Sequence, residues 1–374
     1  MKFITLLITF TLAFFSLSSF ETQTAAPPVE KLKNSSEEII GKLPDMFQST
    51  VKEFQSLRYQ LSVLLFNEKP QPDFTPTEES KPNLKAPTNG VISIYNVELG
   101  QSKQSVEEEL GKPKRISKNE YGSNWYTYHN HFQNFMMVSY DSSGKVNGLY
   151  SNHDIISSQS GIKHGSTRTE VHSALGEALD TIRKGNKLYK LDFDSGFEIY
   201  RINGAYYTIF YDKQEGNTVT GVQIISDSLE KQKNGYYAKT SKDLQASFEK
   251  QLFDLTNADR SEKKLPLLKW DEKISMTALN HSKDMARNNF FSHTNLEGES
   301  PFDRMADDGI AFSTAGENLA YGQNSAIFAH EGLMNSPGHR KNILLTEYRS
   351  LGIGVSFNQH GQPYYTENFY TKRY

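Results

Sequence analysis

The sequence contains no cysteine in its 374 residues. No disulfide can therefore brace the fold, and no thiol can act as a nucleophile, so stability must come from packed cores. A charge excess of either sign is also lacking, because 41 Lys and Arg stand against 44 Asp and Glu, a net charge of −3. This near-balance, without a basic block, argues against a nucleic-acid partner. The chain is rich instead in Phe (23) and Tyr (20), which supply apolar surface for cores, and its length predicts more than one domain.

Long hydrophobic runs are scarce, apart from one at the N-terminus. After Lys2, the residues from Phe3 to Phe20 are apolar except for Thr and Ser. This pattern predicts an export signal within residues 1–26. Two outcomes stay open: cleavage after small residues at 16–18 or 24–26, or retention as a membrane anchor, since the run is close to spanning length. Either way we expect an extracellular or cell-envelope protein that contacts the membrane only through this segment.

Residues 29–66 form an expected amphipathic helical segment. Apolar residues recur every three or four positions from Ile39 to Leu64, and Pro44 fits the first turn of the continuous helix. The segment either packs on its own protein or pairs with a copy of itself; its polar face is not basic enough to favour a membrane-surface role. Residues 67–90 then contain five prolines, which predicts an extended linker that cannot pack.

Residues 91–230 contain an internal repeat. "GQSKQSVEEELGKP" from Gly100 is matched by "GSTRTEVHSALGEA" from Gly165, an offset of 65 residues. Each copy predicts a short helix ended by glycine, and alternating aromatic stretches after it predict a β-hairpin. We therefore expect a duplicated α+β domain. Its histidines are scattered, which favours surface or packing positions, and its expected role is binding or placement.

Residues 240–374 predict a further α+β domain. A first helix carries apolar residues from Leu244 to Leu255, and a second places His281 on its buried face, as a hydrogen-bonded core histidine. Ser300 with Asp303 resembles a capping box that begins a third helix, and the chain closes with two alternating strands.

Four polar residues of this domain are candidates for a site. His293 and Glu317 are predicted to lie in loops. In "SPGHR", Ser336 fits an N-cap, Pro337 the first helical position and His339 the third, where the helix dipole lowers the pKa of the imidazole. Neutral imidazole binds metals and accepts protons. Glu331 shares a helix face with apolar residues, so it is either buried with a partner or at the solvent edge.

Five ordered motifs carry a family resemblance: "LTNADR", "LPLLKWDEKI", "HSKDMARNNFFSHTNLEGESPFDRM", "GENLAYG" and "LMNSPGHRKNIL". They resemble the bacterial branch of the CAP superfamily, named for cysteine-rich secretory proteins, antigen 5 and plant pathogenesis-related proteins. The resemblance implies an α-β-α sandwich and an extracellular location. The duplicated region resembles the CAP-associated domain found upstream of such domains in exported proteins of spore-forming Gram-positive bacteria.

The resemblance also implies a cleft lined by two histidines and one or two glutamates. The motifs carry over to His293, Glu317 and His339, and Glu331 lies in the helix of the second glutamate, where the register does not fix it. In some relatives such residues bind zinc or another divalent ion, for which His293, Glu317 and His339 are the matching ligands. Leu333 stands where relatives often carry tryptophan, which would reshape the cleft wall.

Three functions remain open. The first is a module that binds an unidentified extracellular ligand or envelope protein. The second is a metal-assisted, peptidase-like hydrolase, or one that uses Ser292 or Ser336 as nucleophile. The third is a structural envelope or spore component. "HEGLM" lacks the second histidine of a zinc-protease helix, and no G-x-S-x-G motif occurs.

Overall fold

The computed structural model describes residues 79–191 and 196–373. The predicted export segment 1–26, the predicted helical segment 29–66 and residues 67–78 of the predicted linker lie outside this range. We call residues 79–236 the N-terminal domain and residues 241–373 the C-terminal domain. No helix within these described residues combines the length and the apolar character that a membrane span requires.

The N-terminal domain is built on a seven-stranded sheet, in which every neighbouring pair is antiparallel. In spatial order its strands are β2 (Arg115–Lys118), β3 (Asn124–Asn130), β4 (Gln133–Tyr140), β5 (Val146–Ser151), β11 (Thr218–Ser226), β10 (Ala205–Asp212) and β9 (Phe197–Ile202). Two small sheets pair β1 (Ile92–Ile94) with β6 (Ile156–Ser158), and β7 (Thr181–Lys184) with β8 (Lys187–Lys190). The helices are α4 (Lys103–Leu110), α5 (Arg168–Leu175) and α6 (Asp227–Glu230).

The two expected halves of this domain meet in the middle of its large sheet, where β5 pairs with β11. The predicted short helices with glycine stops are confirmed. Ser102 caps α4 and Thr167 caps α5, and the chain leaves these helices at Gly111 and Gly176 with φ of 75° and 80°. The hairpins β4–β5 and β10–β11 are confirmed as well.

The linker prediction is wrong for residues 79–90, because a buried carboxylate holds this stretch against the N-terminal domain. Glu98 accepts the backbone N–H groups of Thr88, Asn89 and Gly90, each at 2.8 Å. The scarcity of apolar residues suggested that the stretch cannot pack. Backbone hydrogen bonds to Glu98 fix its end, and Leu84 packs against the core of the domain.

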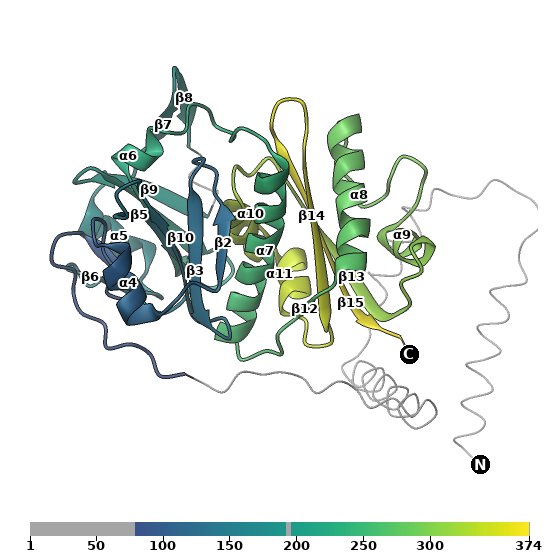
Figure 1. The fold of residues 1–374 in the computed structure, drawn as a ribbon, viewed down its shortest axis with the longest axis horizontal. Helices are drawn as coiled ribbons and strands as arrows, with labels where there is room; N and C mark the ends of the chain where they lie inside the picture. Colours follow the sequence, from purple (N-terminus) through teal and green to yellow (C-terminus); the bar gives the residue numbers. More distant parts are fainter. Residues whose placement is uncertain (1–78, 192–195, 374) are drawn as a thin grey trace, which may run out of the picture. The chain divides into compact units, whose positions relative to one another are not determined.

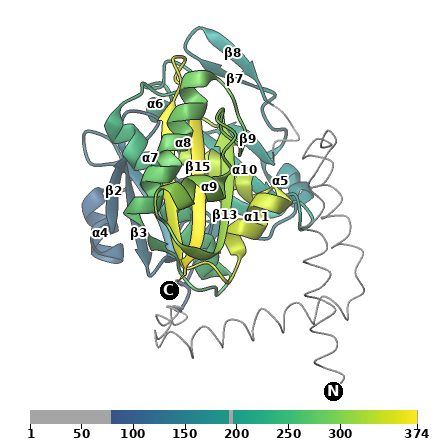
Figure 2. The ribbon, with the colours of Figure 1, turned by 90° about the vertical axis from the view of Figure 1, so that its right-hand side faces the viewer.

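The C-terminal domain has a four-stranded sheet between helices. The strand order is β12 (Lys269–Trp270), β14 (Ser350–Phe357), β15 (Pro363–Lys372) and β13 (Phe312–Tyr321); β12 runs parallel to β14 and the other pairs are antiparallel. Its helices are α7 (Lys242–Glu262), α8 (Glu272–Asn288), α9 (Pro301–Asp307), α10 (Ala326–Met334) and α11 (Pro337–Leu344). Figure 1 shows α7 and α8 on opposite sides of β14, an α-β-α arrangement. In Figure 2, α8 and α9 lie in front of the sheet.

Glycines in β14 let α8 approach the sheet closely. A Cβ atom at Gly354 would collide with the backbone of Leu279, and one at Gly352 would collide with the backbone of Ser275. The predicted second and third helices are confirmed, including the buried His281 and the capping box of Ser300 and Asp303.

The two domains share one hydrophobic core. Trp125, Tyr150 and Phe210 of the large sheet belong to the same buried cluster as Phe248 of α7 and Ile327 of α10. Figure 1 shows α7 and α10 between the two sheets. Polar contacts add to this interface: Arg115 holds Asp254 through two hydrogen bonds of 2.6 and 3.0 Å, and Arg340 donates to Asp212 at 2.8 Å.

Candidate ligand-binding cleft

Glu317 lies in the middle of strand β13, not in a loop as predicted. It pairs with Asn368 of β15. The sequence around it, "STAGENLAYG", contains Gly and Asn, which are poor strand formers. Pairing with β15 along the whole segment overrides this weak propensity, and the strand holds Glu317 rigidly with a buried side chain.

The carboxylate of Glu317 is bonded through both oxygens. Its Oε1 lies 2.9 Å from Nδ1 of His293, and its Oε2 accepts from Arg304 at 2.7 Å. Arg304 also donates to the backbone carbonyls of His293 and Glu299, so it fixes the loop that carries the histidine. In the neutral ring, Nδ1 donates to the carboxylate, which leaves Nε2 as the unprotonated nitrogen on an exposed side chain.

His339 is the second candidate imidazole, and it occupies the third position of α11, as predicted. Its carbonyl accepts from Asn318 at 3.2 Å, and Asn342 of the same helix donates to the carbonyl of Glu317 at 3.3 Å. These bonds tie α11 to β13. The pKa of His339 is lowered, as expected, but the cause is burial and then the neighbouring His293. The imidazole is therefore neutral near pH 7.

A metal ion fits this arrangement only in part. In the described residues, no three His, Asp or Glu side chains are placed to hold one ion. Both oxygens of Glu317 already have protein partners, so this residue orients His293 and does not face outward as a ligand. Two imidazole nitrogens, those of His293 and His339, remain available, and imidazole is a preferred ligand of Zn²⁺.

Glu331 is placed apart from this cleft. It is buried, and its carboxylate accepts from Tyr150 of the N-terminal domain at 2.7 Å and from Thr220 at 3.5 Å. Of the two alternatives left open by the sequence, burial with a partner is confirmed. Burial raises its pKa to about 7, helped by the negative charge of Asp259. The structure thus brings His293, Glu317 and His339 together, and leaves Glu331 at the domain interface.

Comparisons with known proteins agree with the division of the chain into an N-terminal and a C-terminal domain. Residues 253–370 match the model of the cysteine-rich secretory protein family, and residues 99–236 match the CAP-associated N-terminal family. The uncharacterized membrane protein YlbC of Bacillus subtilis (strain 168) is 30% identical over 310 residues, which cover 78% of this chain and 86% of that protein. The chain belongs to the CAP family. It combines a CAP domain with an N-terminal CAP-associated domain.

Other relatives match over different lengths. The uncharacterized protein YkwD of B. subtilis is 42% identical over 109 residues, 29% of this chain and 42% of that protein. An extracellular protein with an SCP domain from Bacillus anthracis has a similar fold, with a TM-score of 0.64 and 24% identity over 79% of this chain and all of that one. A cysteine-rich secretory protein from Staphylococcus aureus gives a TM-score of 0.59 and 17% identity, and the match covers 77% of this chain and 95% of that one.

Two partner residues in this CAP protein could not be found from the sequence: the partner of Glu317 and the partner of Glu331. Arg304 follows the predicted capping box, and no local pattern marks it as the partner of Glu317. Tyr150 lies 181 residues before Glu331, so only the docking of the two domains brings them together. Ser336 occupies the N-cap position as predicted, but its side chain makes no capping hydrogen bond.

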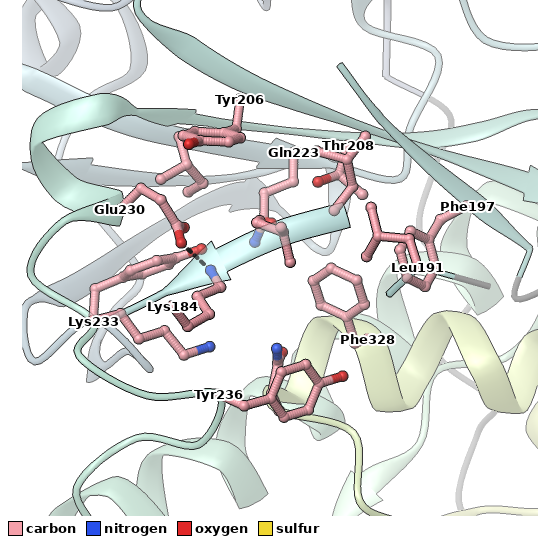
Figure 3. A pocket seen from close by; sticks show the side chains of 15 residues that line it. Lys184, Leu191, Phe197, Tyr206, Thr208, Gln223, Glu230, Lys233, Tyr236 and Phe328 are labelled. Atoms are coloured by element: carbon pink, nitrogen blue, oxygen red, sulfur yellow. Dashed lines mark hydrogen bonds and ion pairs between the residues drawn. The ribbon is translucent and has the colours of Figure 1, made fainter. Parts of the chain in front are cut away.

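A second, enclosed pocket lies where the CAP domain meets the CAP-associated domain. Figure 3 shows Phe328 of α10 facing Lys184, Glu230 and Lys233 across it, with Lys184 and Glu230 paired. Burial lowers the pKa of Lys233 to about 8. The pocket volume is about 40 Å³, which holds water molecules and no larger ligand. The group of His293, Glu317 and His339 remains the better candidate site.

Proposed function

We propose that this chain is an exported, cell-envelope CAP protein that binds a ligand at a cleft formed by His293, Glu317 and His339. Support for the location comes from the N-terminal hydrophobic run and from relatives described as extracellular, secretory or membrane proteins. The ligand is an extracellular molecule or an envelope protein. A role in sporulation, which the resemblance to proteins of spore-forming bacteria suggests, is part of the same proposal.

One observation carries the binding proposal: a buried acid holds an exposed imidazole in a fixed orientation. Glu317 lies in the middle of β13, is bonded to Arg304, and holds Nδ1 of His293, whose side chain is 52% exposed. Preorganised polar groups of this kind cost little to order when a ligand binds.

The proposal includes a divalent ion, with His293 and His339 as its ligands and Glu317 as the outer partner of His293. A bound ion would act as an electron-pair acceptor for an oxygen or nitrogen of the ligand. Two protein ligands hold zinc less tightly than the three or four found in catalytic and structural sites. We therefore expect micromolar rather than nanomolar affinity.

Calorimetric titration of Zn²⁺ into the metal-stripped full chain tests this proposal. The full chain is used because the CAP domain shares its core with the CAP-associated domain. We expect micromolar binding that His293→Ala and His339→Ala each weaken at least tenfold, since each removes one of two ligands. The exposed His360, outside the cleft, provides the matched control His360→Ala.

Unaltered zinc binding in both cleft variants would contradict the metal proposal, because the ion would then sit elsewhere. No binding by the unmodified chain would also overturn it and would leave a metal-free interaction module. Metal-assisted hydrolysis stays the alternative function. It gains support only if zinc binding is accompanied by turnover of a peptide substrate that both cleft substitutions abolish.

We further propose that the CAP-associated domain arose by duplication and serves to place the CAP domain. The support is the pair of equivalent helices, α4 and α5, with hydroxyl N-caps and glycine C-caps at the same offset of 65 residues. A purely structural envelope role for the whole chain would predict that cleft substitutions leave the cellular phenotype unchanged.

A further inference from the structure

An open pocket of the CAP domain is bordered by Arg304, the partner of Glu317. It has a volume of about 230 Å³ and is bordered by one face of α8, the loop of residues 295–299, and α9. This volume is smaller than that of typical drug-sized sites, so it suits a compact ligand or a single side chain. The pocket goes beyond the proposed function, which concerns the cleft of His293 and His339.

The border of this pocket is strongly acidic. It carries five carboxylates: Asp284, Glu297, Glu299, Asp307 and Asp308. In the described part of the chain, none of these five forms an ion pair within 4.0 Å. The guanidinium of Arg304 also borders the pocket, but Glu317 already balances its charge. The pocket is thus a negatively charged hollow that favours a cation.

Two of the carboxylates are held in position by neighbouring side chains. Glu299 accepts from the side-chain amide of Asn295 at 2.7 Å, and Asp308 accepts from the hydroxyl of Thr277. The loop between them is also ordered, because Asn295 accepts the backbone N–H of Glu299 at 2.7 Å. The acidic border is therefore partly preorganised.

The buried wall of the pocket contains an acceptor without a partner. His281 is 1% exposed and borders the pocket, and its Nε2 lies 2.9 Å from the backbone carbonyl of Ser292. A carbonyl only accepts, so Nε2 carries the proton and Nδ1 is a lone-pair acceptor. Nδ1 is buried and unbonded. A buried acceptor left unpaired is costly, so a ligand that donates a hydrogen bond here would remove that cost.

A donor without a partner borders the same pocket. The two terminal nitrogens of Arg304 bond to Glu317 and to backbone carbonyls, while its Nε is buried and unbonded. The pocket wall thus presents one acceptor and one donor, inside a ring of carboxylates. A ligand that satisfies both must offer a hydrogen-bond donor and, beside it, an acceptor; the acidic border favours a donor that carries positive charge.

The charge distribution favours a molecular cation over a metal ion. No three of the carboxylates and imidazoles in the described residues converge on a point where they would share one ion. A spread ring of carboxylates matches the larger radius of an ammonium group. We propose that this pocket binds a compact ligand in which a primary ammonium lies next to an oxygen acceptor, the unit H₃N⁺–C–C=O found in amino acids and at peptide N-termini.

Binding of glycinamide to the ¹⁵N-labelled full chain at pH 6.5 tests this proposal by NMR. We expect saturable shifts in the amides of α8 and α9 and a change in the ¹⁵N shift of Nδ1 of His281, which reports its new hydrogen bond. Ethylamine, which lacks the oxygen, should bind at least threefold more weakly. Tetramethylammonium, which lacks N–H donors, should not shift Nδ1.

Charge-neutral variants locate the site. Asp284→Asn and Asp307→Asn together should weaken glycinamide binding about tenfold, the effect of losing charged hydrogen-bond partners. Asp243→Asn, an exposed position on α7, removes the same charge outside the pocket and should leave the affinity unchanged.

Several outcomes would overturn the inference. Equal binding of glycinamide and tetramethylammonium would reduce the pocket to a non-specific acidic surface. Shifts that persist in the Asp284 and Asp307 double variant would place the ligand elsewhere. Saturable Ca²⁺ binding that displaces glycinamide would make the pocket a metal site, and no shift at 50 mM glycinamide would remove the site altogether. A dipeptide amide that competes with glycinamide would extend the ligand to peptide N-termini.

Discussion

Replacing Trp125 with alanine is expected to lower the free energy of unfolding by about 4 kcal/mol, or on the order of 10 °C in Tm. Trp125 is fully buried on β3 and belongs to the cluster that joins the large sheet to α7 and α10. Because this cluster contains residues of both domains, the loss should appear in a single cooperative transition. Differential scanning calorimetry with intrinsic fluorescence and far-UV circular dichroism measures it.

The matched control is Leu188→Ala. Leu188 is a large apolar residue of the same domain, but 59% of it is exposed, so its truncation should change stability by no more than about 0.5 kcal/mol. Two separate transitions, of which Trp125→Ala shifts only one, would contradict the shared core. The two domains would then be independent units joined by a polar interface.

This coupling explains why individual elements were readable from the sequence while the domain interface was not. The repeat at Gly100 and Gly165 and the helical stripe from Leu244 are local patterns, and each predicts its own element. The apolar residues of β3 alternate like those of any buried strand. Nothing local distinguishes Trp125, which faces the second domain, from Tyr128, which faces the opposite core.

The candidate site shows the same limit. His339 could be assigned to a helix start because Ser336 and Pro337 form a local signal. Its pKa is lowered in the expected direction, but by burial and by His293, which only the folded chain supplies. The partnership of His293 with Glu317 and Arg304 depends on a strand, a loop and a helix that meet only in the folded chain. Glu317 looked like a loop residue because its strand consists of weak strand formers held by β15.

The carboxylate of Glu331 is expected to make the protein less stable as pH rises from about 5 to 8. Its pKa is raised from 4.5 to about 7 by burial and by Asp259, so the folded state favours the protonated form. The folded state therefore binds more protons than the unfolded state between these two values, and stability falls as pH rises through this window. A shift of this size corresponds to about 3 kcal/mol.

Glu331→Gln isolates this effect. The amide keeps the size of the side chain and can still accept from the hydroxyl of Tyr150, but it carries no charge at any pH. At pH 5 we expect the variant to be less stable by up to about 1 kcal/mol, the value of one imperfect hydrogen bond. At pH 8 it should be more stable than the unmodified chain by about 2 kcal/mol, because the cost of a buried charge is gone.

The pH dependence of the difference between the two proteins is the quantity to measure, by urea denaturation at pH 5, 6, 7 and 8. Other groups near the interface also titrate. Glu367 has a pKa raised to about 7, His330 has a raised pKa, and that of His129 is lowered to about 3. Glu367 and His129 are present in both proteins, so to first order they cancel in the difference. His330 contributes to the difference, because the charge of Glu331 is one cause of its raised pKa. Glu347→Gln, at an exposed position, supplies a control whose difference should not vary with pH.

A crossover near pH 6 to 7 would show that a charge on Glu331 weakens the contact between the two domains. The reason lies in its partners: the carboxylate is bonded to Tyr150 and Thr220 of the CAP-associated domain, while Asp259 of the CAP domain adds a second negative charge beside it. A difference that stays flat across this pH range would mean that Glu331 is ionised throughout. Its interface position would then have to be stabilised by His330, which it neighbours on α10 and which pairs with Asp259 at 2.7 Å.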